Sequence, residues 1–206
     1  TAMRLVDLDL IQSTTQGQLK VDHDAQQTKV QGAITFDPTL VRIPKSLPAD
    51  LVLLDMEEIN TPLKPQAEPS TSTLRPINLD LALDFPARLM VSGRGLDSEW
   101  SGNLKVSNTH IDPRLVGQMN LLRGKFDFLD RTFTLTKGQI LLDGQNPPNP
   151  YVDIQGQVQV METLIMVHIH GPAQNFQIAL SSLPVLPQDE LLSLILFGRS
   201  LQQISP

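Results

Sequence analysis

His168 and His170 are the pair of residues whose spacing best suits metal chemistry. They alternate with Ile165, Val167 and Ile169, and this alternation predicts a β-strand. Residues two apart on a strand project to the same side, as two imidazole ligands of a metal ion would. However, no acidic residue lies nearby at ligand spacing, and the 206 residues include no cysteine. We therefore predict that both histidines lie on the polar face of a strand.

Pairs of aspartates are the next candidates, because paired carboxylates bind calcium or act as a catalytic acid pair. The alternation places each pair where a strand faces solvent, which favours solvated side chains. The pairs are Asp7 with Asp9, Asp22 with Asp24, and Asp80 with Asp84.

Two further patterns resemble catalytic motifs without completing them. Residues 92–95 (SGRG) are glycine-rich like a phosphate loop, but no third glycine and no helix follow, so they predict a tight turn. No G-x-S-x-G motif is present, and the spacing of Ser98 and His110 does not indicate a triad. We predict that the chain is not an enzyme and has no catalytic residue, metal site or cofactor.

Composition limits the possible partners. The net charge is −6, and no cluster of lysine and arginine indicates a nucleic-acid surface. The longest apolar runs, such as residues 191–197, are far shorter than the roughly 20 residues of a membrane-spanning helix. The chain begins Thr-Ala-Met without the pattern of a signal peptide, and we interpret it as a fragment of a longer protein.

Period-two alternation is the dominant pattern and predicts half-buried strands with one apolar face. In residues 77–85 (INLDLALDF) every odd position is a large apolar residue. Because each strand offers the same kind of face, the set predicts one continuous hydrophobic surface. The predicted lining residues are Ile77, Leu79, Leu81, Leu83, Leu89, Val91, Leu104, Val106, Met119, Leu121, Phe126, Phe128, Phe133, Leu135, Ile140, Leu142, Val152, Ile154, Val158, Val160, Ile165, Val167, Ile169, Phe176, Ile178 and Leu180.

Turn-forming residues separate these runs, at 92–95, 122–124, 136–138, 143–148 and 170–172, and they predict antiparallel hairpins. The predicted fold class is all-β. We expect a long, curved, mostly antiparallel sheet that forms a taco-like trough with a hydrophobic concave face, since strand twist curves a sheet of this length.

Two segments depart from the alternation. Residues 57–76 contain four prolines with Ser, Thr and Glu, which predicts a disordered loop between a strand group at 1–56 and a β domain at 77–206. Residues 187–197 predict a short helix, with Pro187 in its first turn, Asp189 and Glu190 at its positive end, and Gly198 as its stop. Its apolar residues lie nearly all round it, so we expect it to cap the sheet.

Three separated stretches resemble the TamB C-terminal domain family, within the AsmA-like and bridge-like lipid transfer superfamily. They are residues 93–102 (GRGLDSEWSG), 122–128 (LRGKFDF) with Phe133 and the hairpin at 138–144, and 186–192 (LPQDELL) with 196–200 (LFGRS). The resemblance covers roughly residues 77 to 200, and residues 4–56 fit in pattern alone.

The resemblance implies a periplasmic module of the translocation and assembly module of Gram-negative bacteria. Proteins of this family are anchored in the inner membrane by an amino-terminal helix, which this sequence lacks, and they work with TamA, an outer-membrane barrel. The implied roles are movement of phospholipid along a hydrophobic trough and assembly of outer-membrane proteins such as autotransporters. The implied partners are phospholipid acyl chains, the TamA-like barrel through the full-length protein, and unfolded outer-membrane proteins.

Three functions remain open at this point. The apolar face carries acyl chains between the two membranes, or an open sheet edge presents unfolded outer-membrane proteins by β-augmentation, or a closed sandwich or solenoid buries its own apolar face as pure structure. Aromatic residues make up 4% of the chain, whereas protein-binding surfaces are rich in Tyr, Trp and Arg anchors. The aliphatic composition favours the lipid hypothesis.

Overall fold

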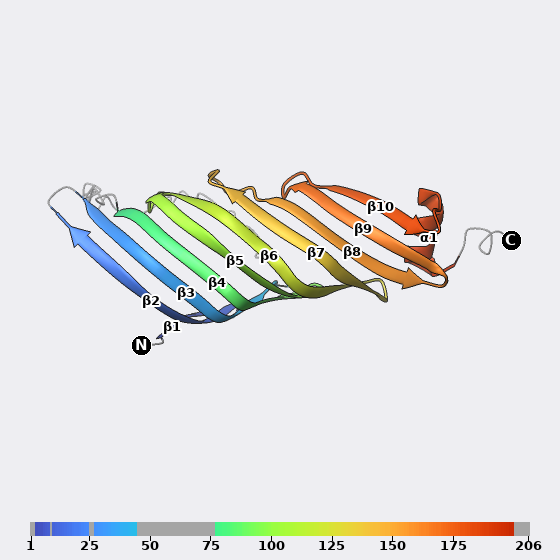
Figure 1. Cartoon of the computed structure of the whole chain (residues 1–206), viewed down its shortest axis with the longest axis horizontal. Helices are drawn as coiled ribbons and strands as arrows, with labels where there is room; N and C mark the ends of the chain where they lie inside the picture. The colour runs from blue at the N-terminus through green and yellow to red at the C-terminus, as the bar shows by residue number, and fades with distance from the viewer. Residues whose placement is uncertain (1–2, 9, 25–26, 45–76, 200–206) are drawn as a thin grey trace, which may run out of the picture.

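The computed structural model consists of a ten-stranded sheet and a helix that follows it (Figure 1). It describes residues 3–8, 10–24, 27–44 and 77–199, with side chains from residue 10 onward. The elements are β1 (Met3–Leu8), β2 (Ile11–His23), β3 (Thr28–Arg42), β4 (Ile77–Gly93), β5 (Leu96–Thr109), β6 (Asp112–Phe128), β7 (Arg131–Asp143), β8 (Tyr151–Val160), β9 (Thr163–Pro172), β10 (Gln177–Leu183) and α1 (Gln188–Phe197).

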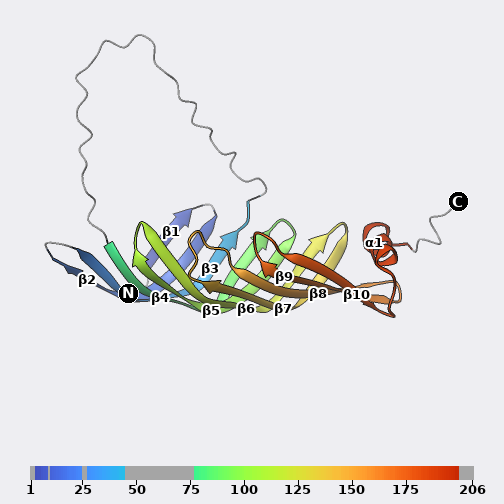
Figure 2. The same ribbon diagram turned by 90° about the horizontal axis from the view of Figure 1, so that it is seen from above.

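Each strand lies beside the next one in the chain, from β1 at one edge to β10 at the other. All neighbouring strands pair antiparallel except β3 and β4, which are parallel. The sheet is curved and stays open, because its two edge strands lie at opposite ends (Figures 1 and 2). The predicted all-β class, with a long, curved, mostly antiparallel sheet and one short helix, is confirmed.

The strands are longer than the turn signals indicated. The predicted turns at 122–124 and 136–138 are wrong, since both segments lie inside the long strands β6 and β7. The physical reason is irregular pairing: the register shifts between Leu135 and Lys137, and between Glu99 and Trp100 opposite the first segment. Bulges use the same glycine and polar residues as turns, so local sequence does not distinguish them. The turns at 92–95 and 143–148 do connect strands, whereas residues 170–172 form the end of β9.

Strand register brings the apolar residues of successive strands to one side of the sheet. Directly paired residues project to the same side, and the pairs include Leu83 with Leu104, Met119 with Ile140, and Ile154 with Ile169. We call this side the apolar face. Phe176 is the one predicted lining residue outside a strand, since β10 begins just after it.

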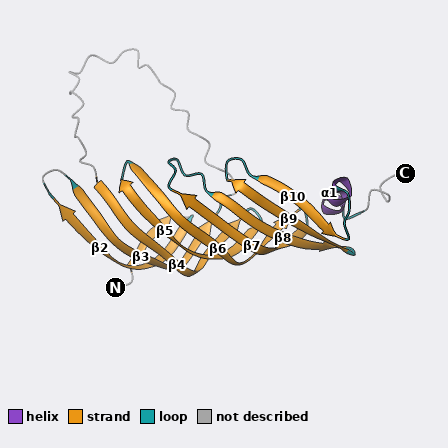
Figure 3. Cartoon of the chain, turned by 45° about the horizontal axis from the view of Figure 1, so that its top comes forward, coloured by secondary structure: helices purple, strands orange, loops and turns teal. Residues whose placement is uncertain are grey.

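The helix α1 covers the apolar face at the β10 end of the sheet (Figure 3). The helix begins at Gln188, one residue later than predicted, so Pro187 is its N-cap and not part of its first turn. Asp189 and Glu190 lie in the first turn and Gly198 ends the helix in the left-handed conformation, as predicted. The buried core contains Leu191, Leu194 and Ile195 from α1, together with Phe133, Val158, Val160 and Ile165 from the sheet. Away from α1, the described residues form a single layer.

The predicted loop at 57–76, and with it the boundary between the two strand groups, lies outside the described residues. The groups on either side belong to the same sheet, because β3 and β4 pair along most of their length, from Thr28 with Ile77 to Arg42 with Ser92.

Candidate functional site

The uncovered part of the apolar face, from β4 to β8, is the largest candidate surface. Its aliphatic side chains are half-buried, as expected for residues that pack against strand neighbours but have no layer above them. They include Leu81, Leu83, Leu104, Val106, Leu121, Ile140 and Ile154. A closed sandwich would bury these residues fully, so the closed-core interpretation is wrong for the part of the chain that the structure describes.

Glycines within the strands shape this face. Gly117 lies between Leu104 and Leu142 in register, and Gly156 lies between Leu135 and Val167. A Cβ added at Gly117 would clash with the carbonyl oxygen of Asn103, and one at Gly156 would lie 3.3 Å from Cδ2 of Leu135. These glycines therefore let neighbouring strands and side chains pack closely on this face. Sequence reasoning missed this role, since glycines inside strands resemble turn signals.

Trp100 is buried on this face. A Cβ added at Gly138 would lie 2.9 Å from Cη2 of the indole, so the ring packs directly over that glycine two strands away. The indole Nε1 donates to Oγ of Ser98 at 2.9 Å, and that hydroxyl donates to the carbonyl of Val91 at 3.2 Å. The polar atoms of this pair are thus used internally, and the ring presents carbon.

The two histidines singled out by spacing lie on the opposite, polar face. Their rings stack with centroids 4.7 Å apart, and Nε2 of His168 lies 2.8 Å from Oδ1 of Asp153 on β8. Lys137 donates to the other oxygen of Asp153 at 2.8 Å. Sequence reasoning missed Asp153, because strand pairing and not local spacing brings it beside the histidines. No group of three or more metal-ligating side chains was found in the described ranges.

The ion pair of Asp153 makes stability depend on pH. The hydrogen bond from Lys137, followed by that from His168, lowers the pKa of Asp153 from its ordinary value of 3.8. A lowered pKa contributes stability above pH 3.8 that is lost as the pH falls through the folded-state value.

We therefore expect Asp153→Asn to lower the melting temperature at neutral pH. The loss in the free energy of unfolding should be less than about 1 kcal/mol, because the ion pair is exposed to solvent. The difference from the unmodified chain should shrink as the pH falls below 3.8, measured by circular dichroism. Asp97→Asn is the matched control, since Asp97 is exposed. A difference that stays constant with pH would contradict the assignment.

The other candidate residues have structural roles or lie apart. Ser98 lies near the start of β5 and His110 just beyond its end, which places them about 40 Å apart at roughly 3.3 Å per residue. Asp22 pairs with Lys20 at 2.9 Å, and Asp80 pairs with Lys105 at 3.1 Å. The side chains of Asp7 and Asp9 lie outside the described residues.

Arg131 is a further residue that the sequence did not single out. It pairs with Phe128 across the β6–β7 hairpin, and this register places its side chain on the apolar face. Its Nε is buried without a hydrogen-bond partner, and its Nη2 packs against Gly198 at the end of α1. A cation on an otherwise apolar face is the strongest polar feature of this surface.

These features define a class of protein: an open, curved β-sheet module with a long uncovered aliphatic face and a capping helix at one end. The chain belongs to the TamB C-terminal domain family, whose model matches residues 1–205.

One curated relative is the translocation and assembly module subunit TamB of Haemophilus influenzae. It is 28% identical over 130 residues, which are 61% of this chain and 10% of that protein. The matched part of the chain thus spans about a tenth of the length of this relative. No helix among the described residues has both the length and the apolar character needed to span a membrane.

Proposed function

We propose that this chain is a periplasmic hydrophobic-groove module that carries phospholipid acyl chains between the inner and outer membranes for outer-membrane biogenesis. The observation that carries the proposal is the continuous aliphatic face that stays uncovered from β4 to β8. The sheet curvature supports placing this face on the inside, since α1 packs against it and lies on the inner side of the curve (Figure 2).

The energetics suit a lipid cargo. Burial of each methylene of an acyl chain contributes roughly 0.8 kcal/mol, so a few methylenes on this face suffice for reversible binding. The headgroup stays at the open side of the groove, in water. No bond is made or broken in this role, so the proposal requires no catalytic residue.

Membership of the family supports a role in an envelope assembly. The relative is named as a subunit of a translocation and assembly module, and we propose that this chain serves in such a module too. From the family resemblance we also propose that its parent protein is anchored in the inner membrane and works with a TamA-like outer-membrane partner.

A second candidate function is presentation of unfolded outer-membrane proteins, such as autotransporters, by β-augmentation. The open sheet supports it, because β10 pairs with β9 on one side and has no strand on its other side in the described structure. An unpaired edge offers backbone donors and acceptors to an incoming strand.

Native mass spectrometry of the chain, purified from a Gram-negative host, tests both functions. We expect mass additions that match intact phospholipids and that disappear when the detergent is exchanged for one that strips lipid. Added masses that match peptides, with no lipid, would favour the edge-strand function. A spectrum of the bare chain under all gentle conditions would argue against both.

A further inference from the structure

Arg131 is a cation on the apolar face that has no hydrogen-bond or ion-pair partner among the described residues. Phe128 pairs with Arg131 and Phe126 pairs with Phe133, so all four side chains project to the same side of the sheet. Among the described residues no hydrogen bond or ion pair engages its guanidinium, and its Nε is fully buried. The buried Nε is out of reach of a ligand, but the Nη atoms are not fully buried in this half-exposed side chain, so they can donate to an acceptor from outside the protein.

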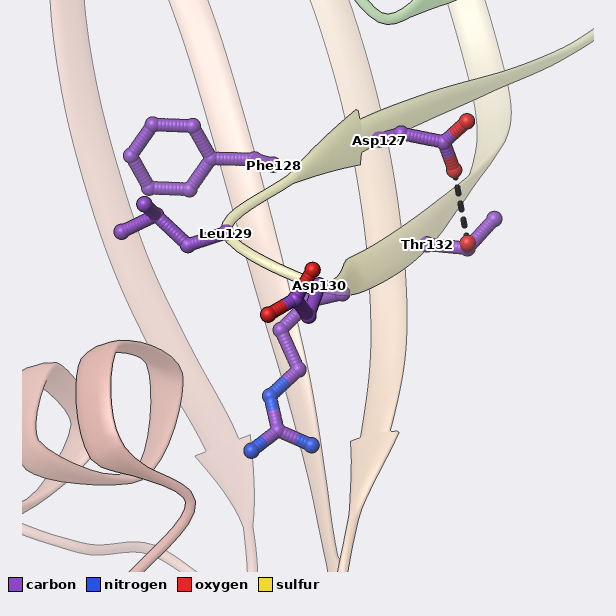
Figure 4. A pocket seen from close by; sticks show the side chains of 6 residues that line it. Asp127, Phe128, Leu129, Asp130 and Thr132 are labelled. Atoms are coloured by element: carbon purple, nitrogen blue, oxygen red, sulfur yellow. Dashed lines mark hydrogen bonds between the residues drawn. The ribbon is translucent and has the colours of Figure 1, made fainter.

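The surroundings of Arg131 form a small depression with mixed character. Residues 127–132 line a hollow of about 500 Å³ at the tip of the β6–β7 hairpin, next to α1 (Figure 4). Phe128 and Leu129 project from one side of the hairpin, whereas Asp127 projects from the other and accepts a hydrogen bond from Thr132 at 2.6 Å (Figure 4). The hollow thus combines exposed apolar surface with an unpaired guanidinium.

Neither nearby acid neutralises this guanidinium. Asp127 is directed to the far side of the hairpin by its bond to Thr132, and Asp130 is exposed in the turn without an ion pair to Arg131. The end of α1 carries a partial negative charge, which is favourable to a nearby cation, but none of its carbonyls accepts a hydrogen bond from Arg131.

We propose that Arg131 binds the phosphate of a phospholipid headgroup whose acyl chains lie on the adjoining apolar face. A guanidinium can bind phosphate through its two Nη atoms, and no hydrogen bond within the described residues uses the Nη atoms of Arg131. Phe128 and Leu129, which are exposed beside it in the hairpin, provide apolar surface for the first part of the chains. The inference rests on the proposed lipid function and names the site of headgroup recognition within it.

The test compares a phospholipid, the same lipid without its phosphate-bearing headgroup, and phosphate without acyl chains. Dihexanoyl-phosphatidylethanolamine, dihexanoylglycerol and inorganic phosphate are titrated into the unmodified chain and into Arg131→Gln by calorimetry. We expect Arg131→Gln to bind the phospholipid about tenfold more weakly, as for loss of one charge-assisted hydrogen bond, and dihexanoylglycerol equally well. Arg131→Lys keeps the charge but loses the planar guanidinium. Its affinity for the phospholipid should lie between those of the unmodified chain and Arg131→Gln.

Lys125→Gln is the matched control. It removes the same charge from the same hairpin, but Lys125 is exposed and lies between Gly124 and Phe126 in sequence, so it projects to the polar face. Its affinity for all three ligands should be unchanged. The melting temperature of Arg131→Gln should be unchanged or higher, because the variant removes an unpaired buried donor.

Several outcomes would overturn the inference. Unchanged phospholipid affinity in Arg131→Gln would do so. An equal loss of affinity for dihexanoylglycerol, together with a lower melting temperature, would also do so, because Arg131 would then be a structural group at the end of α1. Inorganic phosphate that binds as tightly as the phospholipid would indicate a free-anion site. If the unmodified chain binds neither lipid, the proposed function itself fails, and this result is distinct from the others.

Discussion

Ile154→Arg is expected to abolish acyl-chain binding while the domain stays folded. Ile154 pairs with Gly138 and with Ile169 in the uncovered part of the apolar face and is half-buried. An arginine there can extend its guanidinium to water at the open side, so the fold tolerates it. An acyl chain that crosses this position would have to desolvate the charge, which costs several kcal/mol and exceeds the gain from a few methylenes.

Each variant needs two measurements, a melting curve and a lipid-binding titration. Gln157→Arg is the matched control, because it introduces the same charge on the same strand. Gln157 pairs with Thr134 and with Met166, and it lies on the opposite side of the sheet from Ile154. Ile140→Arg should behave like Ile154→Arg. A folded Ile154→Arg variant that binds lipid normally and supports growth of a strain lacking the parent protein would refute the groove function and favour the edge-strand function.

Ile165→Ala is expected to cause the largest loss of stability. Ile165 is 0% exposed and packs in the core between the sheet and α1. Removing its side-chain methylenes leaves a cavity that the long strands cannot close, and such substitutions cost about 2–5 kcal/mol. Chemical denaturation followed by the fluorescence of Trp100, which is the single tryptophan, measures the change.

Ile178→Ala serves as the control for this variant, since Ile178 lies on the same face but is 60% exposed. Its stability should change by less than about 0.5 kcal/mol. Equal losses for the two variants would mean that α1 does not cover the sheet as the structure indicates. Val158, at 8% exposure under α1, belongs with Ile165, so a charge there tests the core and not the open groove.

The sequence alone determined the composition of the two faces of the sheet. In residues 77–85 the period of two assigns each apolar side chain to one side, and this depends only on the geometry of an extended backbone. The same local physics placed the helix, because Pro187, the acidic first turn and Gly198 act within a few residues of the helix ends. The family resemblance rested on motifs that are equally local.

The tertiary structure decided the strand lengths, the strand register and which part of the apolar face α1 covers. Residues 122–124 and 136–138 continue their strands as irregular segments, because hydrogen bonds from neighbouring strands outweigh the local preference for turns. Pairing between strands, and not spacing along the chain, brings Asp153 to His168 and carries Arg131 onto the apolar face. The position of α1 leaves Ile154 half-buried and encloses Ile165, since one ten-residue helix covers only part of so long a sheet.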